Sequence, residues 1–244
     1  MSAAPEVVRH DDDGDALAAA VAERLVARLL DLQDAGRVPS VVLTGGTIAE
    51  KLHRAVVTDP RSAQVDWARV DFWFGDERYV PAGDPDRNAG QARAAMLDHL
   101  PVAPERVHEM PASDGEYGDD VDAAAAAYAA GLGAAPAFDV LMLGVGPDGH
   151  CASMFPGHPA LSADGVAVAV RDSPKPPPTR ISLTLSTLGR ADEVWFVASG
   201  EGKADAVRDA LADGDVVDVP AAGPKGRTRT LWLVDDAAAS HLPR

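Results

Sequence analysis

A short apolar segment that runs into a glycine-rich polar loop, between Asp139 and Pro156, constrains the fold more than any other stretch. Residues 140–143 are all apolar, which is typical of a parallel strand buried on both faces. Glycines and a proline at positions 144–149 then end the strand in a tight turn. Because open α/β sheets bind ligands at the carboxyl ends of their strands, we expect a site at this loop.

The loop carries three polar side chains, Asp148, His150 and Ser153, within six positions. If a helix begins near His150, the i,i+3 spacing places His150 and Ser153 on one helix face. An imidazole with an ordinary pKa of roughly 6.5 can accept a proton near pH 7, so His150 is the candidate general base. Asp148 either orients His150 or closes its own loop through an Asx-turn.

The rest of the chain alternates short apolar strands with helical patterns. The expected strands cover residues 6–9, 40–43, 70–74, 107–110, 140–143, 166–170, 181–185, 194–197 and 231–234. The expected helices include Leu17 to Leu29, with the acids Asp11 to Asp13 as its cap, then residues 48–56, 89–100 and 119–132, and a segment that ends at Leu211. This alternation predicts an α/β fold with a mainly parallel sheet covered on both faces. No linker interrupts it, so we expect a single domain over residues 1–244.

The charge balance limits the possible partners. The chain has 22 Lys and Arg against 38 Asp and Glu, a formal net charge of −16. Nucleic acid and anionic membranes both require phosphate neutralisation, so this balance disfavours them as partners. A phosphorylated small molecule would need a focused basic pocket within the acidic surface.

Cysteine content and the N-terminal segment bear on the compartment. The one cysteine, Cys151, cannot form an internal disulfide, and acids occupy the first residues where a signal peptide would be basic and then apolar. No apolar run reaches the roughly 18 residues that span a bilayer. We therefore expect a cytoplasmic protein.

A possible phosphate cradle follows the strand at 40–43, where Thr44-Gly45-Gly46-Thr47 precedes a helix. Glycines let backbone N–H groups approach an anion, and the helix N-terminus adds partial positive charge. The two threonines can donate hydroxyl hydrogen bonds. The alternative is an ordinary turn in which Thr47 is only the helix N-cap.

Three further strand ends carry charged groups. Gly75-Asp76-Glu77-Arg78 has an alternative interpretation as an exposed turn with a local Glu77–Arg78 ion pair. Lys175 and Arg180 flank a stiff proline-rich connection. Lys203 follows a glycine turn at the start of a helix. The alternative interpretation of all three residues is a position on the solvent-exposed surface. Asn88 is a plausible helix N-cap. Their shared placement at strand ends nevertheless predicts a small-anion site.

Two other chemistries at the His150 loop are less favoured. A Ser153–His150 pair could form an acyl-enzyme, but the nucleophile-elbow pattern is missing around Ser153. Asp148, His150, Cys151 and His158 could suggest zinc, but their spacing matches no recognised ligand pattern. A lone cysteine is more often a small buried apolar residue.

Four motifs in order, Leu-Thr-Gly-Gly-Thr, Gly-Asp-Glu-Arg, Leu-Gly-Val-Gly-Pro-Asp-Gly-His-Cys-Ala-Ser-Met-Phe-Pro-Gly and Ser-Pro-Lys-Pro-Pro, resemble the 6-phosphogluconolactonase family. The resemblance runs from about Val41 to Lys203, and Asp148-Gly149-His150 is its most specific part. It implies hydrolysis of 6-phosphoglucono-1,5-lactone in the pentose phosphate pathway, without a metal or an organic cofactor. It also implies the three-layer αβα fold shared with glucosamine-6-phosphate deaminase and ribose-5-phosphate isomerase.

The related deaminases provide the alternative function. They resemble this chain at the Asp-Gly-His turn, but their following Phe-Asn-Glu-Pro segment contributes a glutamate that contacts the catalytic histidine. Phe155 stands at that position here. Because phenylalanine cannot orient or charge-stabilise an imidazole, we favour the lactonase. A non-catalytic sugar-phosphate-binding module is a third interpretation.

These motifs together define the candidate site. The candidate catalytic residues are His150, Asp148 and Arg78. The candidate substrate-binding and phosphate-binding residues are Thr44, Gly45, Gly46, Thr47, Asp76, Asn88, Gly149, Ser153, Lys175, Arg180 and Lys203. Arg78 or Lys175 would face the oxyanion, and the sequence does not divide the remaining basic residues between carbonyl and phosphate. We expect a sugar phosphate lactone as ligand and a monomer or weak homodimer.

Overall fold

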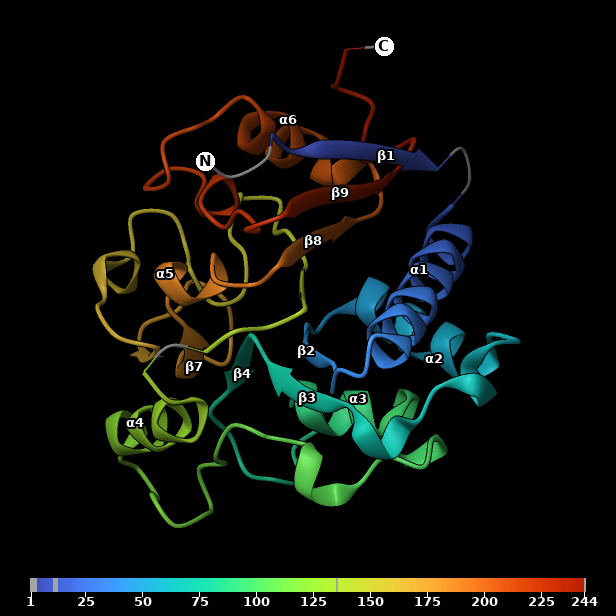
Figure 1. Cartoon of the computed structure of the whole chain (residues 1–244). Coiled ribbons are helices and arrows are strands. Elements are labelled where there is room, and N and C mark those ends of the chain that lie inside the picture. Colours follow the sequence, from blue (N-terminus) through green and yellow to red (C-terminus); the bar gives the residue numbers. More distant parts are fainter. Residues whose placement is uncertain (1–3, 11–12, 135, 244) are drawn as a thin grey trace.

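A parallel sheet forms the centre of the computed structural model, which describes residues 4–10, 13–134 and 136–243 (Figure 1). Its six strands have the order β1-β9-β8-β5-β2-β3. They are β1 (Glu6–His10), β2 (Ser40–Leu43), β3 (Asp71–Phe74), β5 (Val140–Leu143), β8 (Glu193–Ala198) and β9 (Arg229–Asp235). β5 pairs with β2 on one side and β8 on the other, and all its residues are buried. The polar loop predicted after residues 140–143 therefore leaves the middle of the sheet.

Helices flank this sheet, as the alternating sequence pattern predicts. The helices of the described residues are α1 (Gly14–Asp34), α2 (Thr47–Thr58), α3 (Asn88–Ala95), α4 (Val121–Leu132), α5 (Leu185–Leu188) and α6 (Ala204–Leu211), of which α4 packs on the smaller sheet described below. Short 3-10 turns occupy Ser62–Gln64, Trp67–Arg69, Leu97–His99, Pro104–Arg106, Pro159–Ser162, Glu201–Lys203 and Pro220–Ala222. α1 packs alongside α2 and also contacts β9. The predicted α/β class with a mainly parallel sheet is confirmed.

A second, antiparallel sheet is the part of the fold that the sequence did not predict. It has the order β4-β7-β6 and consists of β4 (Asp76–Arg78), β6 (Ala167–Val170) and β7 (Arg180–Leu183). The connection between β6 and β7 contains no helix, whereas parallel strands need a crossover of a dozen or more residues, usually helical. α4 covers this small sheet. Strand β4 of this sheet contributes two predicted site residues, Asp76 and Arg78, to the cleft described below.

The first helix begins at an acidic cap, as expected. The Asp13 carboxylate accepts hydrogen bonds from the N–H groups of Asp15 and Ala16, and Asp11 and Asp12 lie outside the described residues. The predicted apolar stripe from Leu17 to Leu29 is buried. Burial of such a stripe against the sheet provides most of the stability of a surface helix.

Three local predictions are wrong. Residues 107–110 form no strand, because Val107 makes only an isolated bridge to Phe72. The helix predicted over 89–100 ends at Ala95 and continues as a separate 3-10 turn. No helix begins near His150, since the chain there forms turns closed by hydrogen bonds from Gly149 N to Gly146 O and from Gly146 N to His150 O.

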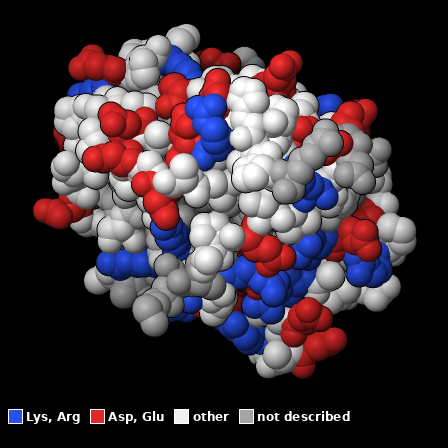
Figure 2. Space-filling model, turned by 90° about the horizontal axis from the view of Figure 1, so that it is seen from above, with Lys and Arg blue, Asp and Glu red and all other residues white. Residues whose placement is uncertain are grey.

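Charged side chains are mixed on the surface. Figure 2 shows acidic and basic groups interspersed over one face, with several basic side chains gathered together in its lower part. A net charge of −16 is therefore compatible with local positive regions. Among the described residues, no helix combines the length and apolar character that crossing a membrane requires.

Candidate active site

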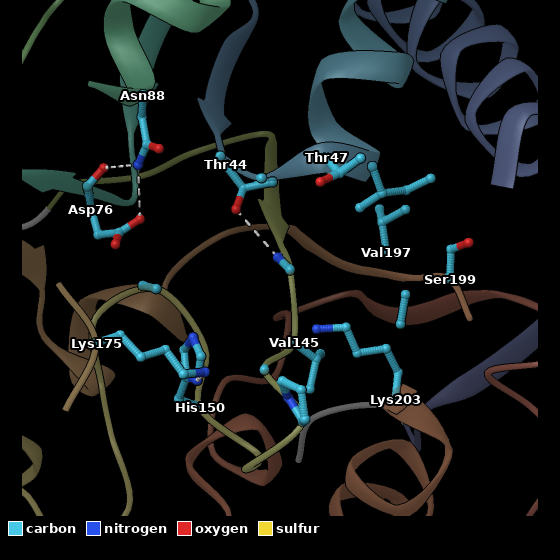
Figure 3. A pocket seen from close by; sticks show the side chains of 18 of the residues that line it. Thr44, Thr47, Asp76, Asn88, Val145, His150, Lys175, Val197, Ser199 and Lys203 are labelled. Carbon is cyan, nitrogen blue, oxygen red and sulfur yellow. Dashed lines mark hydrogen bonds between the residues drawn. The ribbon is translucent and has the colours of Figure 1, made fainter. Parts of the chain in front are cut away.

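A cleft of about 510 Å³ opens where several strands of the parallel sheet end (Figure 3). Loops after β2, β5 and β8 meet there with β4 and with the first residue of β7. The cleft is lined by Thr44, Gly45, Gly46, Thr47, Ile48, Lys51, Asp76, Arg78, Asn88, Gly144, Val145, Gly146, Pro147, His150, Ala152, Lys175, Pro176, Arg180, Val197, Ala198, Ser199 and Lys203. All predicted site residues are among these except Asp148, Gly149 and Ser153.

The loop between β2 and α2 depends on its two glycines. Gly46 has a φ of +97° and is the N-cap of α2, a conformation that L side chains rarely adopt. A Cβ atom on Gly45 would lie 1.9 Å from Asn88 Oδ1. Thr44 Oγ1 accepts a hydrogen bond from Gly144 N at 3.2 Å, which joins this loop to the one after β5. Thr47 is the first residue of α2 and not its cap.

The His150 ring is held by neighbours from two loops. Its Nδ1 atom hydrogen bonds with Asp148 Oδ1, so the two side chains do touch. Lys175 Nζ lies 3.3 Å from the same Asp148 oxygen and 3.2 Å from His150 Nδ1, and Figure 3 shows its side chain running up to the imidazole. A Cβ atom on Gly146 would lie 1.9 Å from Nδ1, so only glycine fits beside the ring.

These contacts determine which ring nitrogen of His150 can act as a base. A carboxylate only accepts and an ammonium only donates hydrogen bonds. Both partners are satisfied when Nδ1 carries the proton and donates it to Asp148, while Lys175 donates to the same carboxylate. The neutral ring then has its lone pair on Nε2, which has no hydrogen-bond partner among the described residues.

Burial and charge move the pKa values of this pair in useful directions. Burial lowers the pKa of His150 below its ordinary value and outweighs the opposing effect of Asp148, while Lys175 lowers it further. Partial burial raises the pKa of Asp148, but the hydrogen bond and charge of His150 and the charge of Lys175 outweigh it, so the net change is downward. Near pH 7 the pair is therefore a neutral imidazole beside an ionised carboxylate.

Phe155 forms an apolar wall of the His150 environment. Its ring centroid lies 4.6 Å from the imidazole centroid, and the Arg180 guanidinium carbon lies 5.5 Å from the same phenyl centroid. The phenyl ring thus contributes to the burial of His150. At this position a phenyl ring meets the imidazole in place of the carboxylate expected of a deaminase.

Three basic residues reach the cleft without a carboxylate partner. Arg78 donates to Asn88 Oδ1, and Arg180 donates to the carbonyl oxygens of Lys175, Pro176 and Pro177. Lys203 extends toward the middle of the cleft (Figure 3), and burial together with Lys175 lowers its pKa. In the described ranges, no carboxylate lies within 4.0 Å of a nitrogen of these three side chains. Their positive charge is therefore available to an anionic ligand.

Ser153 and Cys151 are structural neighbours of the cleft. Ser153 is fully buried, and its hydroxyl donates to Asp76 Oδ2 at 2.6 Å, so it does not pair with His150. Burial raises the pKa of the Cys151 thiol. Within the part of the chain that the structure describes, no three His, Cys, Asp or Glu side chains are grouped to hold a metal ion.

The segment Gly75-Asp76-Glu77-Arg78 differs most from its predicted surroundings. It was expected as a possible exposed turn, yet Glu77 is 1% exposed and lies in β4. Glu77 contacts Arg87 at 3.9 Å and not the Arg78 guanidinium. Asn88 is the first residue of α3, where Arg87 is the N-cap, so its predicted capping role is also wrong.

The sequence did not point to some residues that line the cleft. Lys51 lies one turn after Thr47 on α2 and pairs with Asp15 at 2.8 Å. Its i,i+4 spacing from Thr47 is the signal that could have identified it. Ser199 follows β8, and its hydroxyl is bound to Asp235 Oδ2 at 2.5 Å. This contact links residues far apart in the chain, so sequence spacing gave no indication of it.

Comparisons with known proteins agree with the geometry. Residues 12–232 match the family described as glucosamine-6-phosphate isomerases/6-phosphogluconolactonase. A 6-phosphogluconolactonase of Streptomyces coelicolor is 51% identical over 254 residues, covering 100% of this chain and 97% of the relative. The structure of the Trypanosoma cruzi 6-phosphogluconolactonase aligns with a TM-score of 0.84 and 25% identity, over 100% and 99% of the two chains. A monomeric glucosamine-6-phosphate deaminase shares the fold, with a TM-score of 0.80 at 19% identity over 97% and 99%.

Proposed function

Because the chain belongs to the family of glucosamine-6-phosphate isomerases and 6-phosphogluconolactonases, we propose that it hydrolyses 6-phosphoglucono-1,5-lactone to 6-phosphogluconate. It is then a carboxylic ester hydrolase of sugar phosphate metabolism. The observation that carries the proposal is the neutral His150, fixed by Asp148 at the wall of a cleft that also contains unpaired basic groups. The proposal involves no metal and no organic cofactor.

The first step uses His150 as a general base. Its Nε2 atom removes a proton from water while the water oxygen attacks the lactone carbonyl carbon, and the carbonyl electron pair moves onto oxygen. Asp148 accepts the Nδ1–H hydrogen bond throughout and stabilises the imidazolium that forms. Its negative charge therefore assists the step without accepting a proton.

The second step breaks the lactone ring. The oxyanion collapses to a carbonyl, the bond from that carbon to the ring oxygen breaks, and the imidazolium returns its proton to the ring oxygen, which becomes a hydroxyl group. Arg78 or Lys175 faces the oxyanion before collapse, and one such donor contributes about 3 kcal/mol. The carboxylic acid product then loses its proton to solvent.

The phosphate lies on the loop between β2 and α2 in this proposal. Free N–H groups at the start of α2 and the hydroxyl groups of Thr44 and Thr47 suit phosphate oxygens. Lys203 and Arg180, which also line the cleft, provide compensating positive charge. Asp76, Asn88, Gly149 and Ser153 shape the loops that hold these groups.

The test is a rate measurement on purified protein. We expect hydrolysis of 6-phosphogluconolactone above its spontaneous rate with no added metal, and the same rate after chelation. Release of ammonia from glucosamine-6-phosphate would instead indicate a deaminase. Binding of sugar phosphates without turnover would indicate the non-catalytic module, and either result would overturn the proposal.

Three further predictions accompany this function. The chain acts as one domain over residues 1–244, as a monomer or weak homodimer. It works in the cytoplasm, a prediction supported by the single buried cysteine. Size-exclusion chromatography with light scattering across a concentration series measures the oligomeric state.

A further inference from the structure

Strand β4 directs its side chains to two different places. Successive side chains of a strand point to opposite faces. Asp76 and Arg78 accordingly line the cleft, whereas Glu77 between them is 1% exposed and lies on the other side. A buried carboxylate next to two cleft residues requires partners, because an unpaired charge in the interior is costly.

The partners of Glu77 are backbone N–H groups of the cleft elements. Its Oε1 atom accepts hydrogen bonds from Arg78 N at 2.8 Å and Asn88 N at 2.7 Å, and Oε2 accepts one from Ala89 N at 2.8 Å. The N-cap residue Arg87 makes no capping hydrogen bond with its own side chain. Glu77 therefore caps α3 from a different element and ties its first turn to β4.

The capped residue Asn88 carries this restraint into the cleft. Asn88 Nδ2 donates to the Asp76 carbonyl oxygen at 2.9 Å, and Asn88 Oδ1 accepts from Arg78 Nη1 (Figure 3 shows the contacts with Asp76). The same Oδ1 atom lies against Gly45, where a Cβ atom would approach to 1.9 Å. The position of Asn88 thus controls both the Arg78 guanidinium and the space beside the Gly45 loop.

We propose that Glu77 is a positioning residue for the reaction, holding Asn88 and Arg78 in the orientation that receives the anionic substrate. The identity of the substrate rests on the proposed function above. Glu77 touches no substrate, and its effect passes through the backbone N–H groups that it binds. Arg87, which is 2% exposed, compensates the buried charge from 3.9 Å.

The first experiment compares Glu77→Gln with Asp120→Asn. Glutamine keeps the size of the side chain but loses the charge and places an NH₂ group against an N–H donor. Asp120 caps α4 through Ala123 N at 3.0 Å and lies outside the cleft, so it is a matched carboxylate-to-amide control. We expect kcat/KM to fall by about ten- to hundredfold in Glu77→Gln, as small misplacements of site groups do, and to stay unchanged in the control. Unchanged kinetics in a folded Glu77→Gln protein would overturn the proposal.

A double-mutant cycle separates positioning from a general effect on stability. In an Asn88→Ala background we expect Glu77→Gln to have little further effect on kcat/KM, because the Asn88 side chain through which Glu77 holds the Arg78 guanidinium is gone. Additive losses would overturn the positioning role. If Glu77→Gln fails to fold, Glu77→Asp keeps the charge on a shorter side chain and is placed in the same cycle with the same expectation.

A structural readout keeps this inference separate from the proposed function. A crystal structure of the Glu77 variant is expected to show Asn88 detached from Asp76 and Arg78 displaced, whatever reaction the enzyme catalyses. Wild-type protein without lactonase activity would refute the function alone. A variant in which Asn88 and Arg78 keep their positions would refute the role of Glu77 alone.

Discussion

Two histidine–aspartate pairs lie at opposite ends of the strands of the parallel sheet. The carboxyl edge is the side of the sheet where the strands end, and the amino edge is the side where they begin. His150 and Asp148 follow β5 at the carboxyl edge. At the amino edge, His108 Nε2 lies 3.1 Å from an oxygen of Asp71, the first residue of β3. The residue types are the same, so the difference between the pairs comes from their surroundings.

The amino-edge pair is partly exposed and makes further contacts with neighbouring side chains. Asp71 also accepts a hydrogen bond from Arg106 at 2.9 Å, and His108 stacks on Trp73 with ring centroids 3.7 Å apart. Other ion pairs lie at this edge, including Arg37 with Asp139 and Arg28 with Glu193, at 2.5 and 2.9 Å. Arg106, Arg37 and Arg28 thus each have a carboxylate partner close to the start of a strand.

At the carboxyl edge the basic groups outnumber their carboxylate partners. Arg78 and Arg180 donate to amide and carbonyl oxygens, and Lys203 extends into the cleft. The comparison shows that a histidine–aspartate pair does not by itself make a site. A site requires the pair to border a cleft whose charge is left for a ligand to neutralise.

The largest expected effect is the loss of the carboxyl-edge imidazole. His150→Ala removes the general base, so kcat should fall by about 10²- to 10⁴-fold while binding of 6-phosphogluconate changes little. His108→Ala is the matched control from the amino edge and should keep full kcat. Steady-state kinetics and calorimetric binding measure the two outcomes. A His150→Ala enzyme with full rate would show that the pairs do not differ in function.

The carboxyl edge was the more predictable of the two, because glycine turns after buried strands have a local sequence signature. Gly45-Gly46 and the Asp148–His150 loop could be placed at strand ends from apolar runs alone. Contacts between residues that are far apart in the chain have no such local signature in the sequence. The hydrogen bond from Ser153 to Asp76 spans 77 positions, and the cap that Glu77 provides to Asn88 spans 11.

The antiparallel sheet shows a second limit of the sequence. Apolar runs at 166–170 and 181–185 correctly indicated strands, but hydrophobic pattern does not specify which strand pairs with which. The buried position of Glu77 follows from this pairing, since β4 lies against β7 with Glu77 opposite Ile181. The sequence therefore left an exposed turn with a local Glu77–Arg78 ion pair open as the alternative for this segment.

A third histidine, which belongs to neither pair, tests whether titration at this protein's histidines affects the fold as well as catalysis. His53 in α2 is 2% exposed, its Nε2 atom has no partner among the described residues, and burial lowers its pKa to about 4. The His53 imidazole binds a proton more readily in the unfolded chain than in the folded chain. The free energy of unfolding is therefore highest above about pH 6.5 and decreases by about 3 kcal/mol as the pH falls toward 4. Denaturant unfolding at several pH values gives the free energy of unfolding at each pH. In His53→Leu this free energy should change less steeply with pH than in the wild-type protein. An identical slope in both proteins would assign the dependence to other groups.

Exchanging one cation at each edge should separate binding from stability. Lys203→Met removes a cleft charge and should raise the KM for the lactone, with binding weakened by about 1.5–3 kcal/mol. Arg37→Met leaves the buried Asp139 carboxylate without its ion-pair partner and should lower the free energy of unfolding by about 1–3 kcal/mol with unchanged KM. Kinetics and thermal unfolding of both variants measure this. A KM change in Arg37→Met would contradict the division between the edges.

The smallest expected effect is a shift in the acidic limb of the pH profile, set by the two charges beside His150. The base must be neutral, and burial holds its pKa below the ordinary value, so kcat/KM should persist below about pH 6.5 and decline only at lower pH. Asp148 raises this pKa and Lys175 lowers it. Asp148→Asn should therefore move the limb to lower pH, with a lower rate at every pH because the Nδ1–H tautomer loses its acceptor. Lys175→Met should move the limb to higher pH, and Asp71→Asn at the amino edge should leave it in place. If Asp148→Asn and Lys175→Met shifted the limb in the same direction, the titrating group would not be the imidazole beside these two charges.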